Sequence, residues 1–216
     1  MITPNNDVGV MQGRLLPKYQ GRYQAHPVGY WQDEFTIAAK LGVSVIEFIV
    51  DYDGYSNNPL IDLEGLKEVA KVVAVSGVSV KTVCADYFME APLHSLKLDQ
   101  VKVSQSVLGT LIQNCARIGI KDIVIPCVDQ SSIQGIEDKD RFVFRLTPLI
   151  DIARDHGIRL ALETDLPAEE FADLLERFPF DVVKVNYDTG NSAAMGYCPA
   201  YELECYGDRV TDIHIK

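Results

Sequence analysis

The segment Met11-Gln12-Gly13-Arg14-Leu15 directly follows the first strand-like run of the chain, and it decides between two fold classes. Open, doubly wound sheets that bind nucleotides normally carry a glycine-rich GxGxxG turn at this point. Here the turn contains one glycine, Gly13, and no GxGxxG motif, whereas polar residues end nearly every strand-like run of the chain. The segment therefore favours a barrel, which builds its active site from polar residues at the C-terminal ends of many strands.

Beyond this segment, strand-like and helix-like segments alternate along the chain. The strand-like runs are apolar and β-branched, as expected for buried parallel strands, and the segments between them have helical spacing. Strict alternation with short connections indicates an α/β protein with a parallel sheet. The expected strands are Val8 to Met11, Val45 to Val50, Val78 to Cys84, Asp122 to Pro126, Arg159 to Glu163, Val182 to Tyr187 and Val210 to Ile215. The expected helices are Trp31 to Leu41, Leu63 to Ser76, Lys97 to Ile118, Asp138 to His156, Pro167 to Phe178 and a shorter one around Pro199 to Tyr206.

The number of strands bears on whether the barrel closes. A (β/α)₈ TIM barrel needs eight strands and has about 250 residues, whereas this sequence has seven strand-like runs in 216 residues. We therefore expect a single TIM-barrel domain over residues 1–216, truncated after the seventh strand, from which helix 7, strand 8 and helix 8 are missing. Unpaired edges on strands one and seven would then promote dimerisation or aggregation, so a truncated, non-catalytic barrel and a homo-oligomer are alternatives to consider.

The composition restricts the partners and the location of the protein. The formal net charge is −11 and the pI is about 4.7, so a nucleic-acid backbone would be repelled. The N-terminus lacks a secretory signal, and no apolar run approaches the roughly 18 residues of a membrane span. We expect a cytoplasmic protein that binds neither nucleic acid nor membranes.

Three candidate metal ligands end consecutive strands. Glu163 ends the fifth strand, Asp188 the sixth and His214 the seventh, with intervals of 25 and 26 residues. Each residue alone has an ordinary alternative: a loop cap, an Asx-type turn or a buried core histidine. Together they place two carboxylates and an imidazole at equivalent positions, which suits Mn²⁺, Mg²⁺, Co²⁺ or Zn²⁺.

Polar residues near the ends of the first three strands are candidates for substrate binding. Arg14 could pair with a phosphate or carboxylate of a substrate, or form a surface salt bridge. A charge at Glu47, inside the apolar second strand, is costly unless it is paired or functional. The full set is Gln12, Arg14, Glu47, Asp86 and His94.

The sequence resembles the sugar phosphate isomerases and epimerases of the xylose-isomerase-like barrel superfamily, which include ketose 3-epimerases, hydroxypyruvate isomerase and inosose dehydratase. The resemblance covers essentially the whole chain. It rests on MQGRL at residues 11–15, Ile46-Glu47, LETD at 162–165, DTGN at 188–191 and HIK at 214–216. It implies that Glu163, Asp188 and His214 bind one divalent metal, with Mn²⁺ favoured. The second glutamate of the family's site, on strand eight, has no counterpart in this sequence.

The resemblance also implies a metal-dependent sugar (phosphate) isomerase or epimerase, whose partner is a small sugar or sugar phosphate. Glu163 would move a proton on the carbon beside a carbonyl, through an enediolate that the metal stabilises. An inosose-dehydratase-like lyase on the same site is the nearer alternative. A nuclease like endonuclease IV is the remote one, because its metal cluster needs many histidines and this chain has four.

Overall fold

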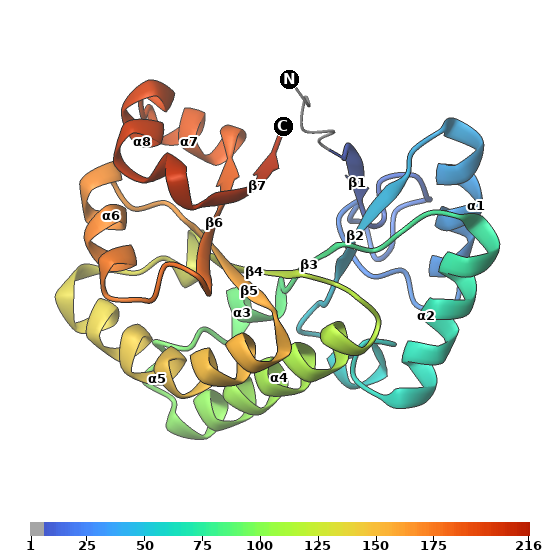
Figure 1. Cartoon of the computed structure of the whole chain (residues 1–216), viewed down its shortest axis with the longest axis horizontal. Helices are drawn as coiled ribbons and strands as arrows, with labels where there is room; N and C mark the ends of the chain where they lie inside the picture. Colours follow the sequence, from blue (N-terminus) through green and yellow to red (C-terminus); the bar gives the residue numbers. More distant parts are fainter. Residues whose placement is uncertain (1–6) are drawn as a thin grey trace.

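The computed structural model describes residues 7–216, which form one sheet of seven parallel strands with helices on its outer side (Figure 1). Neighbouring strands in the sheet are also neighbours in the sequence, from β1 to β7. Figure 1 shows the sheet curving so that β7 comes round towards β1. The strands are β1 (Gly9–Met11), β2 (Val45–Ile49), β3 (Thr82–Cys84), β4 (Asp122–Cys127), β5 (Arg159–Thr164), β6 (Val183–Asp188) and β7 (Val210–His214). The expected α/β barrel architecture with seven strands is confirmed.

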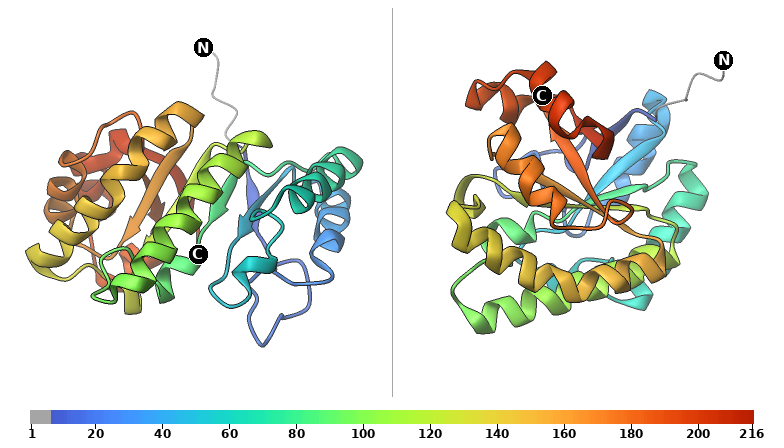
Figure 2. Two further views of the ribbon diagram at one scale, coloured as in Figure 1. Left: turned by 90° about the horizontal axis from the view of Figure 1, so that it is seen from below. Right: turned by 60° about the vertical axis from the view of Figure 1, so that its left-hand side comes forward.

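The longer helices follow the strands and cover the outer face of the sheet, as the further views show (Figure 2). The helices are α1 (Trp31–Leu41), α2 (Leu63–Ser76), α3 (Tyr87–Glu90), α4 (Leu98–Arg117), α5 (Gly135–His156), α6 (Ala168–Glu176), α7 (Thr189–Met195) and α8 (Pro199–Tyr206). Three short 3₁₀ turns are η1 (Tyr55–Asn57), η2 (Asp129–Ser131) and η3 (Gly207–Arg209). Within residues 7–216, no helix is long and apolar enough to cross a membrane.

Four elements differ by more than two residues from the sequence prediction. The third strand is shorter than expected, because the start of its run makes only an isolated bridge between Val45 and Ser79. Helix α5 begins at Gly135, three residues before the expected start. Two short helices, α3 and α7, were not predicted, because they are only four and seven residues long and lack a helical repeat.

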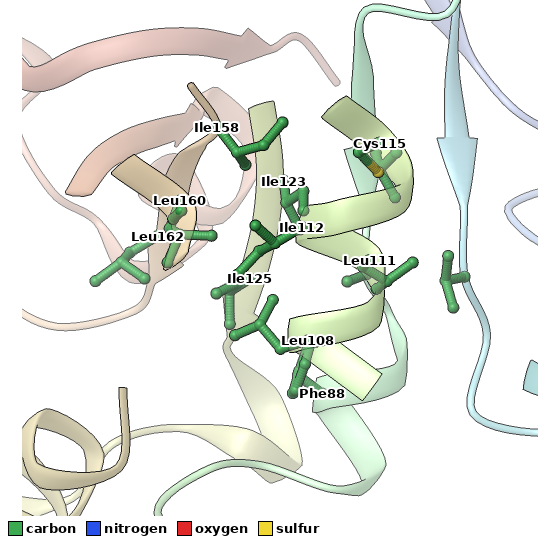
Figure 3. Close-up of a cluster of buried hydrophobic side chains, with 14 of the residues drawn as sticks. Phe88, Leu108, Leu111, Ile112, Cys115, Ile123, Ile125, Ile158, Leu160 and Leu162 are labelled. Carbon is green, nitrogen blue, oxygen red and sulfur yellow. The ribbon is translucent and has the colours of Figure 1, made fainter. Parts of the chain in front are cut away.

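The main core lies between the sheet and the outer helices. Figure 3 shows side chains of α4, among them Leu108 and Ile112, packed against β4 and β5. A smaller cluster lies on the inner face of the sheet and consists of Ile49, Cys84, Val124 and Ala161. The strands are thus apolar on both faces, which explains why they appear in the sequence as continuous rather than alternating runs.

The sheet is open along two edges in the described part of the chain. There β1 pairs only with β2, and β7 pairs only with β6. Ile213 of β7 is 58% exposed and Val8, beside β1, is 80% exposed. Both edges carry free backbone groups next to apolar side chains.

Candidate metal centre

Alternation along the strands decides which side chains point to the inner face of the curved sheet. Successive residues of a strand point to opposite faces. Ala161 of β5 belongs to the inner cluster, so Glu163, two residues further on, points the same way. The equivalent step from Ile49 back along β2 places Glu47 on that face as well. The inner face therefore carries the small apolar cluster and, on the same side of the sheet, the carboxylates of Glu47 and Glu163.

The structure brings Glu163, Asp188 and His214 together at this end of the sheet. One ligand atom from each lies within 4.8 Å of those of the other two. His214 Nδ1 is 3.5 Å from Glu163 Oε2 and 3.7 Å from Asp188 Oδ2. Ligands that share one ion at ~2.0–2.2 Å lie ~3–4 Å apart, so these separations are close to those of a ligand set.

Negative charge dominates this cluster. His214 Nε2 lies 2.8 Å from Glu47 Oε2, so three carboxylates surround one imidazole. Burial acting alone would lower the pKa of His214, but hydrogen bonds to Asp188, Glu163 and Glu47 raise it to about 12. Three carboxylates this close together favour the binding of a cation between them.

Asp188 has a second cationic neighbour. Lys216 Nζ lies 2.5 Å from Asp188 Oδ2. Burial of Asp188 would raise its pKa, but hydrogen bonds from His214 and Lys216 outweigh this effect and hold the pKa well below its usual range. Asp188 is thus a carboxylate at neutral pH, as a metal ligand must be.

Two asparagines, which the sequence analysis did not select, hold the carboxylate of Glu163. Asn186 Nδ2 donates to Glu163 Oε2 at 2.6 Å, and Asn191 Nδ2 donates to Glu163 Oε1 at 2.7 Å. The signal was present in the sequence, because Asn186 is two residues before Asp188 on the same face of β6 and Asn191 ends the DTGN motif. Both oxygens of Glu163 are therefore fixed in direction by amides from neighbouring elements.

Asp188 also caps the helix that carries Asn191. Its Oδ1 accepts the backbone N–H groups of Gly190 and Asn191, both at 2.9 Å, at the N-terminus of α7. This is the usual role of an N-cap aspartate. Oδ2, the oxygen beside His214, does not take part in the cap and points to the cluster.

The residues at the cluster fit one divalent ion. Two carboxylates and an imidazole form the donor set that Mn²⁺, Mg²⁺, Co²⁺ and Zn²⁺ accept. Asn186 Oδ1, on the face of β6 that also carries Asp188, is buried without a hydrogen-bond partner in residues 7–216. Buried polar atoms normally have partners, so this atom points to a polar ligand or solvent at this place.

Of the five residues expected to bind substrate, Glu47 contacts the cluster and Asp86 is affected by the charge of Glu163. Glu47 contacts His214, as described above. Asp86 follows β3, and its carboxylate accepts from Cys84 Sγ at 3.1 Å and from Gln24 Nε2 at 3.2 Å. Burial raises the pKa of Asp86 to about 6.

The remaining three have other hydrogen-bond or packing partners. Gln12 is buried, and its Oε1 accepts from the N–H of Ile49 at 3.0 Å, which ties the end of β1 to β2. Arg14 is exposed and donates to Gln24 Oε1 at 3.3 Å. The ring of His94 packs on Phe142 of α5, with centroids 6.2 Å apart, and burial lowers its pKa. The structure thus joins Glu47 to the three ligand candidates and places His94 against α5.

Fold and site together define an α/β protein of the TIM-barrel class with an acidic cluster at the C-terminal ends of its strands. Residues 35–216 match the model of the family described as xylose isomerase-like TIM barrel. The chain belongs to the xylose isomerase-like TIM barrel family, as its motifs suggested.

Several similar proteins are named as epimerases. A 2-epi-5-epi-valiolone 7-phosphate 2-epimerase from an Actinoplanes species is 26% identical over 166 residues, which are 76% of this chain and 59% of the relative. The chain therefore spans less than two thirds of the length of that relative.

Solved structures with the same fold include a 3-keto-D-glucoside 4-epimerase from E. coli, with a TM-score of 0.72 and 15% identity over 96% of this chain and 77% of that one. A D-psicose 3-epimerase from Clostridium cellulolyticum H10, solved with D-tagatose, has a TM-score of 0.70 and 18% identity over 85% of this chain and 66% of that one. At these identities the likeness concerns the fold.

Proposed function

We propose that the protein is a metal-dependent isomerase or epimerase of a sugar or sugar phosphate. The observation that carries this proposal is the convergence of Glu163, Asp188 and His214 on the inner face of the sheet. In barrels of this kind the active site lies at the C-terminal ends of the strands, where these three residues are. The epimerase names of the similar proteins supply the class of reaction.

Glu163, Asp188 and His214 would hold one divalent ion, with Mn²⁺ favoured and Mg²⁺, Co²⁺ or Zn²⁺ as alternatives. When bound, such an ion polarises the carbonyl of the substrate and stabilises the negative charge that develops on its oxygens. A strand placed between β7 and β1 could contribute a fourth carboxylate to the same centre, within a single TIM-barrel domain.

Glu163 is the proposed general base. It removes or returns a proton on one face of the carbon next to the carbonyl. Asn186 and Asn191 each donate to one of its oxygens, which keeps the carboxylate from rotating while the proton moves. Epimerisation needs a second acid on the opposite face, which the proposed fourth carboxylate would supply.

Substrate hydroxyl groups would contact polar side chains around the cluster. Glu47 and Asp86 receive the strongest support, since both follow or occupy strands whose inner side faces the centre. Gln12 and Arg14 lie at the end of β1 and would contact the far end of a sugar or its phosphate. His94 receives the least support, because its ring packs on α5.

The first test is replacement of the proposed base. Glu163→Gln removes the charge but keeps the shape, so kcat on a panel of ketoses and ketose phosphates is expected to fall by roughly 10²- to 10⁴-fold. Elemental analysis should find about one metal ion per chain of the unsubstituted protein, because four ligands of this kind coordinate a single ion. Glu176→Gln, on the exposed side of α6, is the control and should leave both unchanged. Unchanged turnover in Glu163→Gln would remove this residue from the chemistry.

The alternatives predict other outcomes in the same assays. A lyase would release water from an inosose and leave the ketoses unchanged, whereas a non-catalytic barrel would turn over nothing. A nuclease centre needs several ions and many histidines, but within residues 7–216 a single group of three potential ligands is present, with one histidine. Three metal ions per chain would support the nuclease alternative.

A further inference from the structure

We propose that Glu202 is a positioning residue for this centre, because through Ser192 it fixes the short helix α7 that carries Asn191 and is capped by Asp188. The inference rests on the proposed function and adds to it a residue that lies outside the cluster. Its basis is a buried carboxylate that the proposed chemistry does not use.

Glu202 lies on α8 and is 4% exposed. Among the described residues, no Lys, Arg or His side chain forms an ion pair with Glu202 within 4.0 Å. A buried carboxylate without a cation is costly unless hydrogen bonds satisfy it. Glu202 must therefore obtain its compensation from neutral donors.

Three hydroxyl groups supply these hydrogen bonds. Tyr187 donates to Glu202 Oε2 at 3.0 Å, and Tyr206 donates to Oε1 at 3.0 Å. Ser192 also donates to Oε2. The three donors come from β6, α8 and α7, so one carboxylate joins three elements.

Helix α7 reaches this carboxylate through its one buried side chain. Of its seven residues, Ser192 is the one that is buried. Tyr206, by contrast, also packs on Phe171 of α6, with ring centroids 4.9 Å apart. Ser192 is thus the buried side-chain anchor of α7, in addition to the hydrogen bonds of Thr189 to His214 O and of Asn191 to Glu163.

The position of α7 determines the geometry of the centre. Asn191 on this helix donates to Glu163 Oε1 at 2.7 Å, and the N-terminus of α7 holds Asp188 Oδ1. Asp188, Asn191, Ser192 and Glu202 line one common pocket. A shift of α7 would therefore change the direction of one proposed ligand and release one oxygen of another.

Two single substitutions separate positioning from general stability. Ser192→Ala and Tyr206→Phe each remove one hydroxyl donor to Glu202, but only Ser192 lies on α7. In hydrogen–deuterium exchange of the full-length protein without metal, Ser192→Ala is expected to speed exchange in Thr189–Met195 at least tenfold. Tyr206→Phe is expected to leave exchange in this segment within about twofold of the unsubstituted protein.

Mn²⁺ binding by calorimetry provides the second readout. Ser192→Ala is expected to weaken affinity about tenfold, in the range for residues that orient ligands, and Tyr206→Phe to leave it unchanged. Glu202→Gln should preserve most of these hydrogen bonds, since the amide oxygen can accept from Tyr187 and Ser192 while the NH₂ group donates to Tyr206. Glu204→Gln, on the exposed side of α8, is the matched control.

The two measurements test the metal function and the positioning role separately. If the unsubstituted protein binds no Mn²⁺, the proposed metal function is wrong, whereas the exchange experiment still decides whether Glu202 and Ser192 fix α7. Equal exchange of Thr189–Met195 in Ser192→Ala and in the unsubstituted protein would overturn the positioning role. Equal effects of Ser192→Ala and Tyr206→Phe on both readouts would also overturn it, because they would indicate a purely structural role.

Discussion

Asp86 illustrates how the inner face of the sheet changes the chemistry of single residues. It follows β3 next to the inner cluster, and its hydrogen-bond partners are the neutral groups of Cys84 and Gln24. Burial therefore prevails and raises its pKa from 3.8 to about 6. Near neutral pH the native protein keeps this buried carboxylate charged, which lowers the free energy of unfolding.

This effect gives a prediction for the dependence of stability on pH. Between about pH 4 and pH 6 the native protein holds a proton on Asp86 that the unfolded chain has released, so the free energy of unfolding falls as the pH rises through this window. Asp86→Asn is expected to reduce this fall by about 2 kcal/mol. Urea unfolding from pH 4 to pH 7 measures it, with the exposed Asp53→Asn as control. Parallel curves for Asp86→Asn and the unsubstituted protein would contradict the assignment.

At the scale of elements, glycines end the helices so that the next strand can enter the sheet. Gly42, Gly77 and Gly157 follow α1, α2 and α5 with φ between 64° and 75°. Residues other than glycine rarely adopt this left-handed conformation. The spacing of apolar residues predicts these helices, and the left-handed glycines mark where three of them stop.

A pair of glycine substitutions tests this reading with opposite signs. Gly157→Ala places a side chain at φ 64° and is expected to lower the free energy of unfolding by about 1 kcal/mol. Gly109→Ala, inside α4, is expected to raise it by about 0.5–1 kcal/mol. There a Cβ would lie 3.7 Å from Leu149 Cδ2, an ordinary contact. Chemical denaturation measures both, and a loss of stability in Gly109→Ala would contradict the account.

At the scale of the whole molecule, the two open edges of the sheet distinguish this structure from a closed barrel. In residues 7–216, β1 and β7 each pair on one side only, with Ile213 and Val8 exposed beside them. Exposed apolar edges form templates for pairing with another chain. We propose that chains of residues 1–216 associate through these edges.

Association through β7 can be tested with a charged edge residue. The unsubstituted chain is expected to show a concentration-dependent increase in sedimentation coefficient over about 1–100 μM. Ile213→Lys should reduce it, because a lysine on an edge strand opposes further pairing. Val75→Lys, on α2 where Val75 is 82% exposed, is the control and should not. Association that persists equally in Ile213→Lys would locate the contact elsewhere.

The sequence by itself determined the order and type of the main elements and the set of candidate ligands. Both follow from periodicity: apolar runs mark buried strands, and residues two apart on a strand share a face. Glu163, Asp188 and His214 could therefore be grouped because each ends a strand of one parallel sheet. Residues at equivalent positions on neighbouring parallel strands lie close together, and one ligand atom from each of these three lies within 4.8 Å of the others.

The tertiary structure alone decided which residues support that cluster. The register of β6 on β7 shifts between Val185 and Asn186, and the docking of α7 brings Asn191 to Glu163, 28 residues away in sequence. Glu202 reaches Ser192 only because α8 packs beside β6 and α7. Packing of His94 against α5 likewise depends on how a loop folds back on a helix. Such contacts arise from the docking of separately formed elements, whose angles and offsets leave no period in the sequence.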